Sequence, residues 1–280
     1  MNADDLGLTT GVNDAVFQAH EHGILTSASL MAGGPAVDDA IARARHHPSL
    51  GIGCHLTLVD GRPVAPLSEV RSLVDAQGCF RPSWRPFIRD ALAGRIALSE
   101  VERELTAQID RLATAGVRLT HLDSHKHVHV YPPIFSIVAG LAARYGVPAV
   151  RVPFEAPVAS VLLSSAGVTN LAIWPWAAID RHRARRLRLN LPAFTGRFLT
   201  GTLTLPALLD AIQRVPPGVT ELMVHPGYLD ADLRAMRTRL LESRAVELAA
   251  LCAPEAQAAV RAHGITLVRH DLHPVALAED

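Results

Sequence analysis

Apolar and polar residues alternate along the chain with two different periods. Val12, Ala15, Val16 and Ala19 recur at helical spacing after Thr9 and Thr10, and Gly23 ends that pattern. The next segments alternate in the same way between extended and helical patterns. They predict a strand at 25–32, a helix at 37–46 and a strand at 51–58.

The alternation of strand and helix continues to the end of the chain. Ser99 and Glu102 form a capping-box pattern before a predicted helix that ends near Ala115 and has Val101, Leu105, Ile109 and Leu112 on one face. We then expect strands at 117–122, 149–152, 220–224 and 265–268, and helices at 134–145, 206–215 and 233–251. Recurrent strand-then-helix units predict an α/β fold with a mainly parallel sheet.

Two stretches interrupt this rhythm. Residues 60–91 are rich in proline, and residues 155–201 contain Trp174, Trp176 and the arginine-rich run Arg181–Arg188. We expect one domain over residues 1–280 with excursions at these two places. The arginine run is typical of a solvated helix face, and the alternative is a basic surface that contacts anionic lipid.

Composition excludes several classes of protein. The chain has 27 basic and 27 acidic residues and a pI near 7.3, so it lacks the basic surplus that nucleic-acid binding needs. Hydrophobic residues make up 49% of the chain, which is typical of a folded protein. Three cysteines, Cys54, Cys79 and Cys252, are too few and too dispersed for a disulfide framework. With an acidic N-terminal segment and no long apolar run, the expectation is a cytoplasmic protein.

Four polar clusters stand where predicted strands end, the position at which parallel α/β folds place active sites. The first cluster is Asp4 and Asp5. Two adjacent carboxylates suggest one bound to a cation and one free for proton transfer, and the alternative is helix capping. The second cluster contains His55, for which a hydrogen-bonded core histidine is the alternative.

The third cluster is the segment His121–His129. In an extended chain its odd-numbered residues share one face, so four imidazoles and Asp123 would point the same way. Burying them without partners would cost several kcal/mol, which favours a metal or proton-transfer site. The fourth cluster is His225 with Pro226 and Gly227, where the histidine stands at a strand tip.

Together the clusters supply an Asp and two His for a divalent metal, with a further Asp and His for proton transfer. That set is typical of metal-assisted hydrolysis. The same residues leave a mononuclear iron oxygenase as one rival, because His121 and Asp123 match half of an iron-binding triad. A sugar-binding protein that has kept the pocket and lost catalysis is the other rival.

The motifs NADDLG, GCHLTL, HLDSHKHVH and HPG resemble those of the YdjC-like carbohydrate deacetylases, the family of chitooligosaccharide deacetylase. The segments VDAQGCF and AVRVPFEAP are most similar to its hopanoid-biosynthesis-associated branch, HpnK. The resemblance implies an incomplete (β/α) barrel of the polysaccharide-deacetylase type. It also implies one divalent metal (Zn, Mg, Mn or Co) and removal of an acetyl group from an N-acetylglucosamine-type sugar, in that branch a hopanoid-linked one.

The resemblance also assigns roles to residues of this chain. It implies that Asp5, His55 and His125 bind the metal, that Asp4 is the general base and that His225 is the general acid. Residues implied to contact the substrate or support the site are His127, His129, Asp123 and Tyr228. Family members carry an apolar strand before this motif, whereas here only Met1 precedes Asn2, so we expect a shortened first strand. A homodimer and a peripheral membrane contact are further partner hypotheses.

Overall fold

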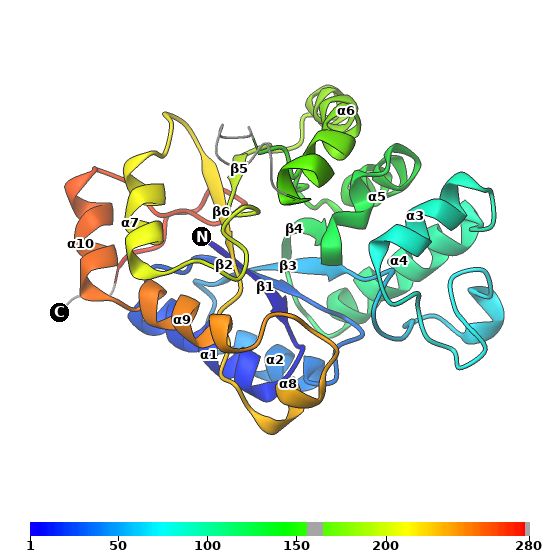
Figure 1. Cartoon of the computed structure of the whole chain (residues 1–280), viewed down its shortest axis with the longest axis horizontal. Helices are drawn as coiled ribbons and strands as arrows, with labels where there is room; N and C mark the ends of the chain where they lie inside the picture. Colours follow the sequence, from blue (N-terminus) through cyan, green and yellow to red (C-terminus); the bar gives the residue numbers. More distant parts are fainter. Residues whose placement is uncertain (156–164, 278–280) are drawn as a thin grey trace.

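A curled sheet of six parallel strands forms the centre of the molecule (Figure 1). The computed structural model describes residues 1–155 and 165–277. Its strands are β1 (Asn2–Leu6), β2 (Ser27–Leu30), β3 (Gly51–Leu56), β4 (Leu119–Ser124), β5 (Ala193–Thr195) and β6 (Thr220–Val224). They lie in the order β4-β3-β2-β1-β6-β5, and every neighbouring pair is parallel. This arrangement confirms the predicted incomplete (β/α) barrel.

The segment predicted as a strand at 149–152 lies in the gap between β4 and β5. It forms only isolated parallel bridges, from Val150 to Leu122 and from Ala149 to Asn190. These bridges narrow the opening of the barrel without adding a full strand. The segment places Arg151 inside the barrel, where that side chain is 1% exposed.

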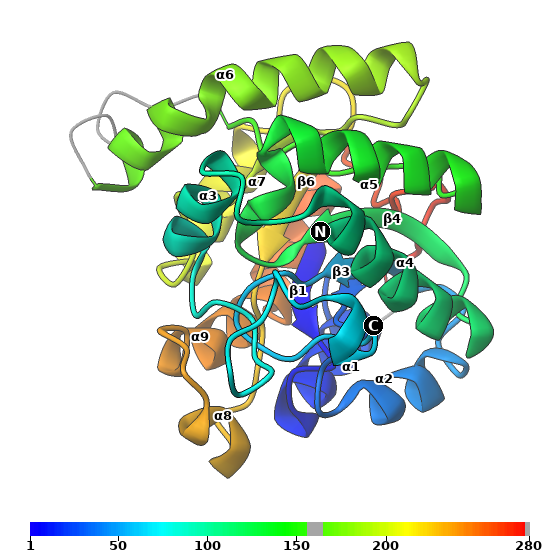
Figure 2. The same ribbon diagram turned by 90° about the vertical axis from the view of Figure 1, so that its right-hand side faces the viewer.

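Helices surround the sheet, as Figures 1 and 2 show. They are α1 (Thr10–His22), α2 (Val37–Ala44), α3 (Trp84–Leu92), α4 (Leu98–Thr114), α5 (Pro132–Tyr145), α6 (Ser165–Arg186), α7 (Leu205–Gln213), α8 (Ala231–Ala235), α9 (Glu242–Leu251) and α10 (Pro254–Ala262). Two 3₁₀ helices, η1 (Leu67–Glu69) and η2 (His125–Val130), complete the described elements. None of the described helices combines the length and the apolar character needed to span a bilayer.

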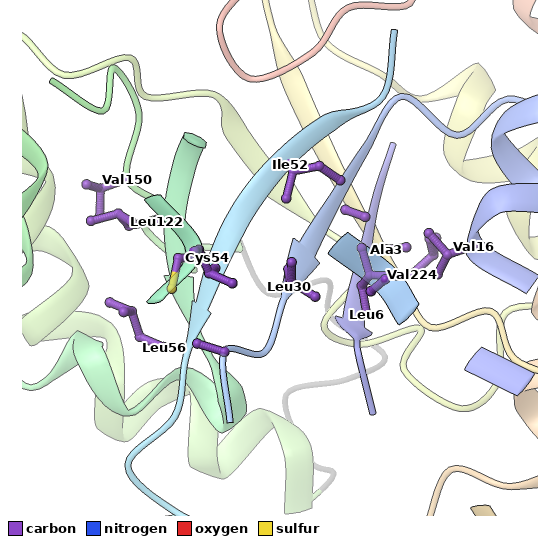
Figure 3. Packing of buried hydrophobic residues seen from close by; sticks show 14 of the residues in the cluster. Ala3, Leu6, Val16, Leu30, Ile52, Cys54, Leu56, Leu122, Val150 and Val224 are labelled. Carbon is purple, nitrogen blue, oxygen red and sulfur yellow. The ribbon is translucent and has the colours of Figure 1, made fainter. Parts of the chain in front are cut away.

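Apolar side chains pack between the strands and the surrounding helices. Figure 3 shows Leu6, Leu30 and Leu56 from three strands in this core, with Val16 of α1 at one side. The predicted apolar face of α4 is fully buried. Its predicted capping box is wrong, because α4 begins at Leu98 and its N-cap Ala97 makes no side-chain bond.

The chain from 233 to 275 differs most from its prediction. In place of one helix at 233–251 there are α8 and α9, since the chain leaves the helical conformation after Ala235. The Thr238 hydroxyl accepts a hydrogen bond from the Leu240 N–H, a local bond that competes with helical pairing. The predicted strand at 265–268 is reduced to one antiparallel bridge, between Val268 and Pro274.

The two excursions are attached to neighbouring helices. Glu104 of α4 is fully buried and accepts hydrogen bonds of 2.9 Å from the backbone N–H groups of Val64 and Ala65, at the start of the first excursion. In the second excursion, α6 lies along α5 (Figure 2), and Arg183 donates to the Pro132 carbonyl at 2.9 Å. The first excursion also reaches the carboxyl end of β4, where Asp60 accepts a hydrogen bond of 2.6 Å from Lys126 Nζ.

Candidate active site

Three side chains from separate strand ends converge at the carboxyl edge of the sheet. They are Asp5 in β1, His55 in β3 and His125 directly after β4. Asp5 Oδ1 lies 3.0 Å from His125 Nδ1 and 3.5 Å from His55 Nε2, and one donor atom from each residue lies within 4.8 Å of the others. One carboxylate and two imidazoles at such spacing fit a divalent cation with open positions for water and substrate.

A bulge in β1 explains how two adjacent acids reach the same site. Neighbouring residues of a regular strand face opposite sides of the sheet. Here the register of β1 with β2 shifts between Ala3 and Leu6, and Asp5 has a left-handed φ of 69°. Bulges of this kind re-aim side chains next to active sites. Helix capping is not the role of either acid, because the side chain that caps α1 is Thr9.

The orientation of His55 is fixed from behind by Asp123. His55 donates from Nδ1 to Asp123 Oδ1 over 2.8 Å, so its Nε2 faces Asp5. Burial lowers the pKa of His55, but the carboxylates of Asp123 and Asp4 outweigh it and raise that pKa to about 10. A carboxylate that holds the far nitrogen of a histidine is the usual support of a metal ligand.

Asp4 is held by a buried guanidinium. Arg151 donates to both oxygens of Asp4, at 2.8 and 2.7 Å, and also lies 2.7 Å from Asp123. Burial raises the pKa of Asp4, while the charge of Arg151 opposes the rise. Asp4, His55 and Asp123 also have donor atoms close enough for a cation, but Arg151 already pairs with both of these carboxylates. The set with Asp5 is therefore the better candidate.

The charges around the site favour a divalent cation. The buried carboxylates closest to the three converging donors are Asp4, Asp5 and Asp123, and they face the buried guanidiniums of Arg151 and Arg244. Burial lowers the pKa of His55 and of His125, but neighbouring carboxylates outweigh it and raise both pKa values, so these imidazoles attract protons when no cation is bound. A divalent cation between the donors would take the place of those protons, because buried charges need compensation.

His225 follows β6 and is buried, with 7% of its surface exposed. Its backbone N–H donates to Glu247 Oε2 at 2.6 Å, and its Nδ1 has no hydrogen-bond partner among the described residues. Burial lowers the pKa of His225 to about 3. The imidazole of His225 is therefore neutral at pH 7 and must gain a proton before it can act as an acid.

The extended arrangement predicted for residues 121–129 is wrong. Strand β4 ends at Ser124, and Lys126 and His127 then adopt left-handed φ values of 56° and 55° inside η2. The imidazoles therefore separate instead of sharing one face. His121 points into the barrel, where it stacks on His270 with ring centroids 3.8 Å apart.

The remaining predicted residues occupy different surroundings. His129 donates from Nε2 to the Arg151 carbonyl at 2.8 Å, so it fastens η2 to that segment. His127 borders a small cavity of about 40 Å³ together with Trp84, Lys126 and Trp176. Tyr228 is 42% exposed, and its hydroxyl bonds to Gln18 of α1, away from the three converging donors.

Several site residues have no signal in the sequence. Arg151 and Arg244 are two of 26 arginines, and Glu221 and Glu247 stand inside ordinary strand and helix patterns. Only the fold shows that their charges meet Asp4, Asp5 and the backbone of His225. A further pattern visible only in the structure is the left-handed φ of Asp5, Asp60, Lys126 and His127, since strained backbone gathers at functional sites.

A family model for YdjC-like protein matches residues 1–262. The chain belongs to this YdjC-like family. It is 35% identical over 271 residues to a carbohydrate deacetylase of Geobacillus stearothermophilus, covering 96% of this chain and 95% of that one. It is 32% identical over 278 residues to a chitooligosaccharide deacetylase of Serratia marcescens, covering 95% of each chain.

A solved structure from Enterococcus faecalis, a candidate cellobiose-phosphate cleavage protein, has the same fold as this YdjC-like chain. The two share 27% identity and a TM-score of 0.76, and the match covers 96% of each chain. Asp5, His55 and His225 all lie inside the YdjC-like match, which covers residues 1–262.

Proposed function

We propose that this chain is a metal-dependent deacetylase that removes the acetyl group from an N-acetylglucosamine-type sugar, working as one catalytic domain. The observation that carries the proposal is the convergence of Asp5, His55 and His125 within 4.8 Å, with the buried side chains of Asp4 and His225 outside that set of three. The names of relatives at 35% and 32% identity support the reaction and the class of substrate.

In the proposed reaction, Asp5, His55 and His125 would hold the cation. A bound divalent cation would polarise the acetamide carbonyl and lower the pKa of a nearby water. Asp4 removes a proton from the attacking water, and burial prepares it for this role by raising its pKa. Arg151 fixes both oxygens of Asp4 and so sets the direction from which the proton is accepted. His225 gives a proton to the departing amine, which would otherwise be a very poor leaving group.

We propose further that the substrate is lipid-linked, as in the HpnK branch. Trp174 stacks on Phe154, Trp176 contacts Tyr131, and α6 with both tryptophans runs over α5. The end of this segment exposes Ile179 and Leu187 among arginines, of which Arg183 bonds to α5. Apolar side chains between arginines favour a contact with anionic lipid over a merely solvated face.

The lipid proposal is tested by flotation with neutral vesicles and with vesicles containing anionic lipid. Replacement of Arg185, Arg186 and Arg188 by glutamine should abolish binding to the anionic vesicles, whereas replacement of Arg234 and Arg237 should not. Equal flotation of both variants would contradict the proposed contact between these arginines and anionic lipid. Loss of one acetyl mass from an N-acetylglucosaminyl lipid, compared with a soluble chitooligosaccharide, tests the substrate. A cytoplasmic location and a homodimer are also part of the proposal.

The deacetylase itself is tested by acetate release from N-acetylglucosamine oligosaccharides with Zn²⁺, Mg²⁺, Mn²⁺ or Co²⁺. Asp4→Asn should keep cation binding and lose turnover, while His55→Ala should lose both. An undiminished rate of acetate release by the Asp4→Asn variant would contradict the role of Asp4 as general base. Acetate release under nitrogen contradicts the iron oxygenase, and sugar binding without acetate release would favour the non-catalytic reading.

A further inference from the structure

Helix α9 places two buried charged side chains next to the site that the proposed reaction does not use. Arg244 and Glu247 stand three residues apart, so they lie on the same side of the helix, about one turn apart. Each is 1% exposed. Arg244 contacts Asp5 from β1, and Glu247 contacts His225 after β6.

Arg244 occupies one oxygen of Asp5 and leaves the other free. Its Nη2 lies 2.5 Å from Asp5 Oδ2, and its Nε donates to the Leu240 carbonyl at 3.1 Å. The opposite oxygen of Asp5, Oδ1, faces His125 and His55. The guanidinium is held by the Leu240 carbonyl at Nε and by Asp5 at Nη2. It therefore fixes which oxygen of Asp5 faces the imidazoles.

The HPG motif makes room for this arginine. A Cβ atom at Gly227 would lie 2.8 Å from Arg244 Cδ and 3.1 Å from its Cβ, which is closer than packed atoms allow. Gly227 is absent from the left-handed residues, so its backbone conformation does not require glycine. The glycine is therefore explained by the passage of Arg244 toward Asp5.

Glu247 fixes the backbone of His225 and leaves the ring free. Its Oε2 accepts a 2.6 Å hydrogen bond from the His225 N–H. The ring Nδ1 of His225 has no partner within the described part of the chain. Glu247 therefore holds the residue in place through its backbone and makes no hydrogen bond to Nδ1 of the ring.

We propose that α9 is a positioning helix, in which Arg244 sets the metal-facing oxygen of Asp5 and Glu247 sets the location of His225. This inference rests on the proposed function and adds two residues to it. One rigid helix turn then couples the metal ligand to the proton donor, although the two stand 220 positions apart in the sequence.

The Arg244 arm is tested by the Kd of the cation-free protein for Zn²⁺ and Mn²⁺, measured by calorimetry with no substrate. Positioning predicts that Arg244→Met weakens binding about 10–100-fold, while Arg237→Met, on the exposed segment before α9, changes nothing. A role through charge alone predicts tighter binding, because a positive charge next to the cation is removed. Unchanged or tighter binding would overturn this arm. If Arg244→Met does not fold, Arg244→Lys keeps the charge, loses the fork and should shift the Kd in the same direction.

The Glu247 arm is tested by separating kcat from KM. Glu247→Ala should lower kcat at least about tenfold, because it leaves a buried N–H unpaired beside the proton donor, with KM and the cation Kd unchanged. Glu247→Gln keeps an acceptor oxygen and should restore kcat, and Glu242→Ala at the exposed start of α9 is the matched control. Equal kcat values for Glu247→Ala and Glu247→Gln would overturn this arm.

Failure of the proposed function and failure of the positioning role of α9 give different results. If the unaltered chain binds no divalent cation and releases no acetate, the proposed function fails. If it does both and the α9 variants behave like their controls, only the positioning role of α9 fails.

Discussion

Replacing Asp123 by asparagine isolates the support behind the candidate metal ligand. Asp123 accepts from His55 Nδ1 at 2.8 Å and from the Ser29 hydroxyl at 2.8 Å, and pairs with Arg151 at 2.7 Å. Asparagine has the same shape but presents one oxygen and no charge. The imidazole of His55 then loses the partner that keeps its Nε2 directed at Asp5.

The expected magnitude follows from these contacts. Loss of a carboxylate behind a ligating histidine weakens metal binding about 10–100-fold, or about 1.4–2.7 kcal/mol. Removing one partner of a buried ion pair also costs stability, here about 3 kcal/mol for the cation-free protein. Loss of the support behind His55 and loss of the negative charge of Asp123 both weaken cation binding, so these two effects on the Kd cannot cancel.

Calorimetric titration of the cation-free variant with Zn²⁺ measures the first effect, and thermal unfolding measures the second. Asp14→Asn is the matched control, because the Asp14 side chain is 56% exposed and its ion pair with Arg43 is a surface contact worth about 0–1 kcal/mol. An Asp123→Asn variant whose Kd stays within about twofold of the unaltered chain would refute the assigned role of Asp123.

Three further predictions concern stability. Gly53→Ala should lower the free energy of unfolding by about 1–3 kcal/mol, because the new Cβ would lie 2.3 Å from His121 Nε2; a denaturant midpoint equal to that of the unaltered chain would contradict this packing. Burial raises the pKa of Asp180 to about 8. An unfolded aspartate has a pKa of about 3.9, so the unfolded chain releases this proton at a lower pH than the folded chain does. The folded chain therefore loses stability as the pH rises from about 3.9 to about 8. Asp180→Asn should therefore raise the Tm more at about pH 8 than at about pH 5, and a gain independent of pH would argue against a buried, protonated carboxyl. Chelation of a cation present at about a hundred times its Kd should remove about 2.7 kcal/mol of stability, and identical Tm values with and without chelator would exclude binding to the folded state.

The sequence allows the parallel α/β architecture to be predicted because both periodicities are strong. The face formed by Val101, Leu105, Ile109 and Leu112 is buried as its spacing indicates. The predictions that were wrong concern segments in which local hydrogen bonds or backbone conformation determine the structure. The Thr238 hydroxyl interrupts the helix expected at 233–251, and the left-handed backbone at Lys126 and His127 breaks the extended run of histidines.

Only those site residues could be predicted whose type and place in the sequence indicate a chemical role. Asp5, His55 and His125 are noticeable because a carboxylate and imidazoles stand at strand ends, and the structure does bring their donor atoms together. Nothing in the sequence distinguishes Arg151 and Arg244 from the other arginines, and arginine side chains are usually exposed. Their roles depend on which strands become neighbours, and that is a property of the fold.

A crystal structure of the protein soaked with Zn²⁺ or Mn²⁺, with anomalous scattering used to locate the ion, tests directly whether Asp5, His55 and His125 bind a divalent cation. We expect one strong peak bounded by Asp5 Oδ1, His55 Nε2 and the ring of His125. A structure in which these three side chains keep their places while no ion lies between them, or the ion binds elsewhere, would contradict this expectation.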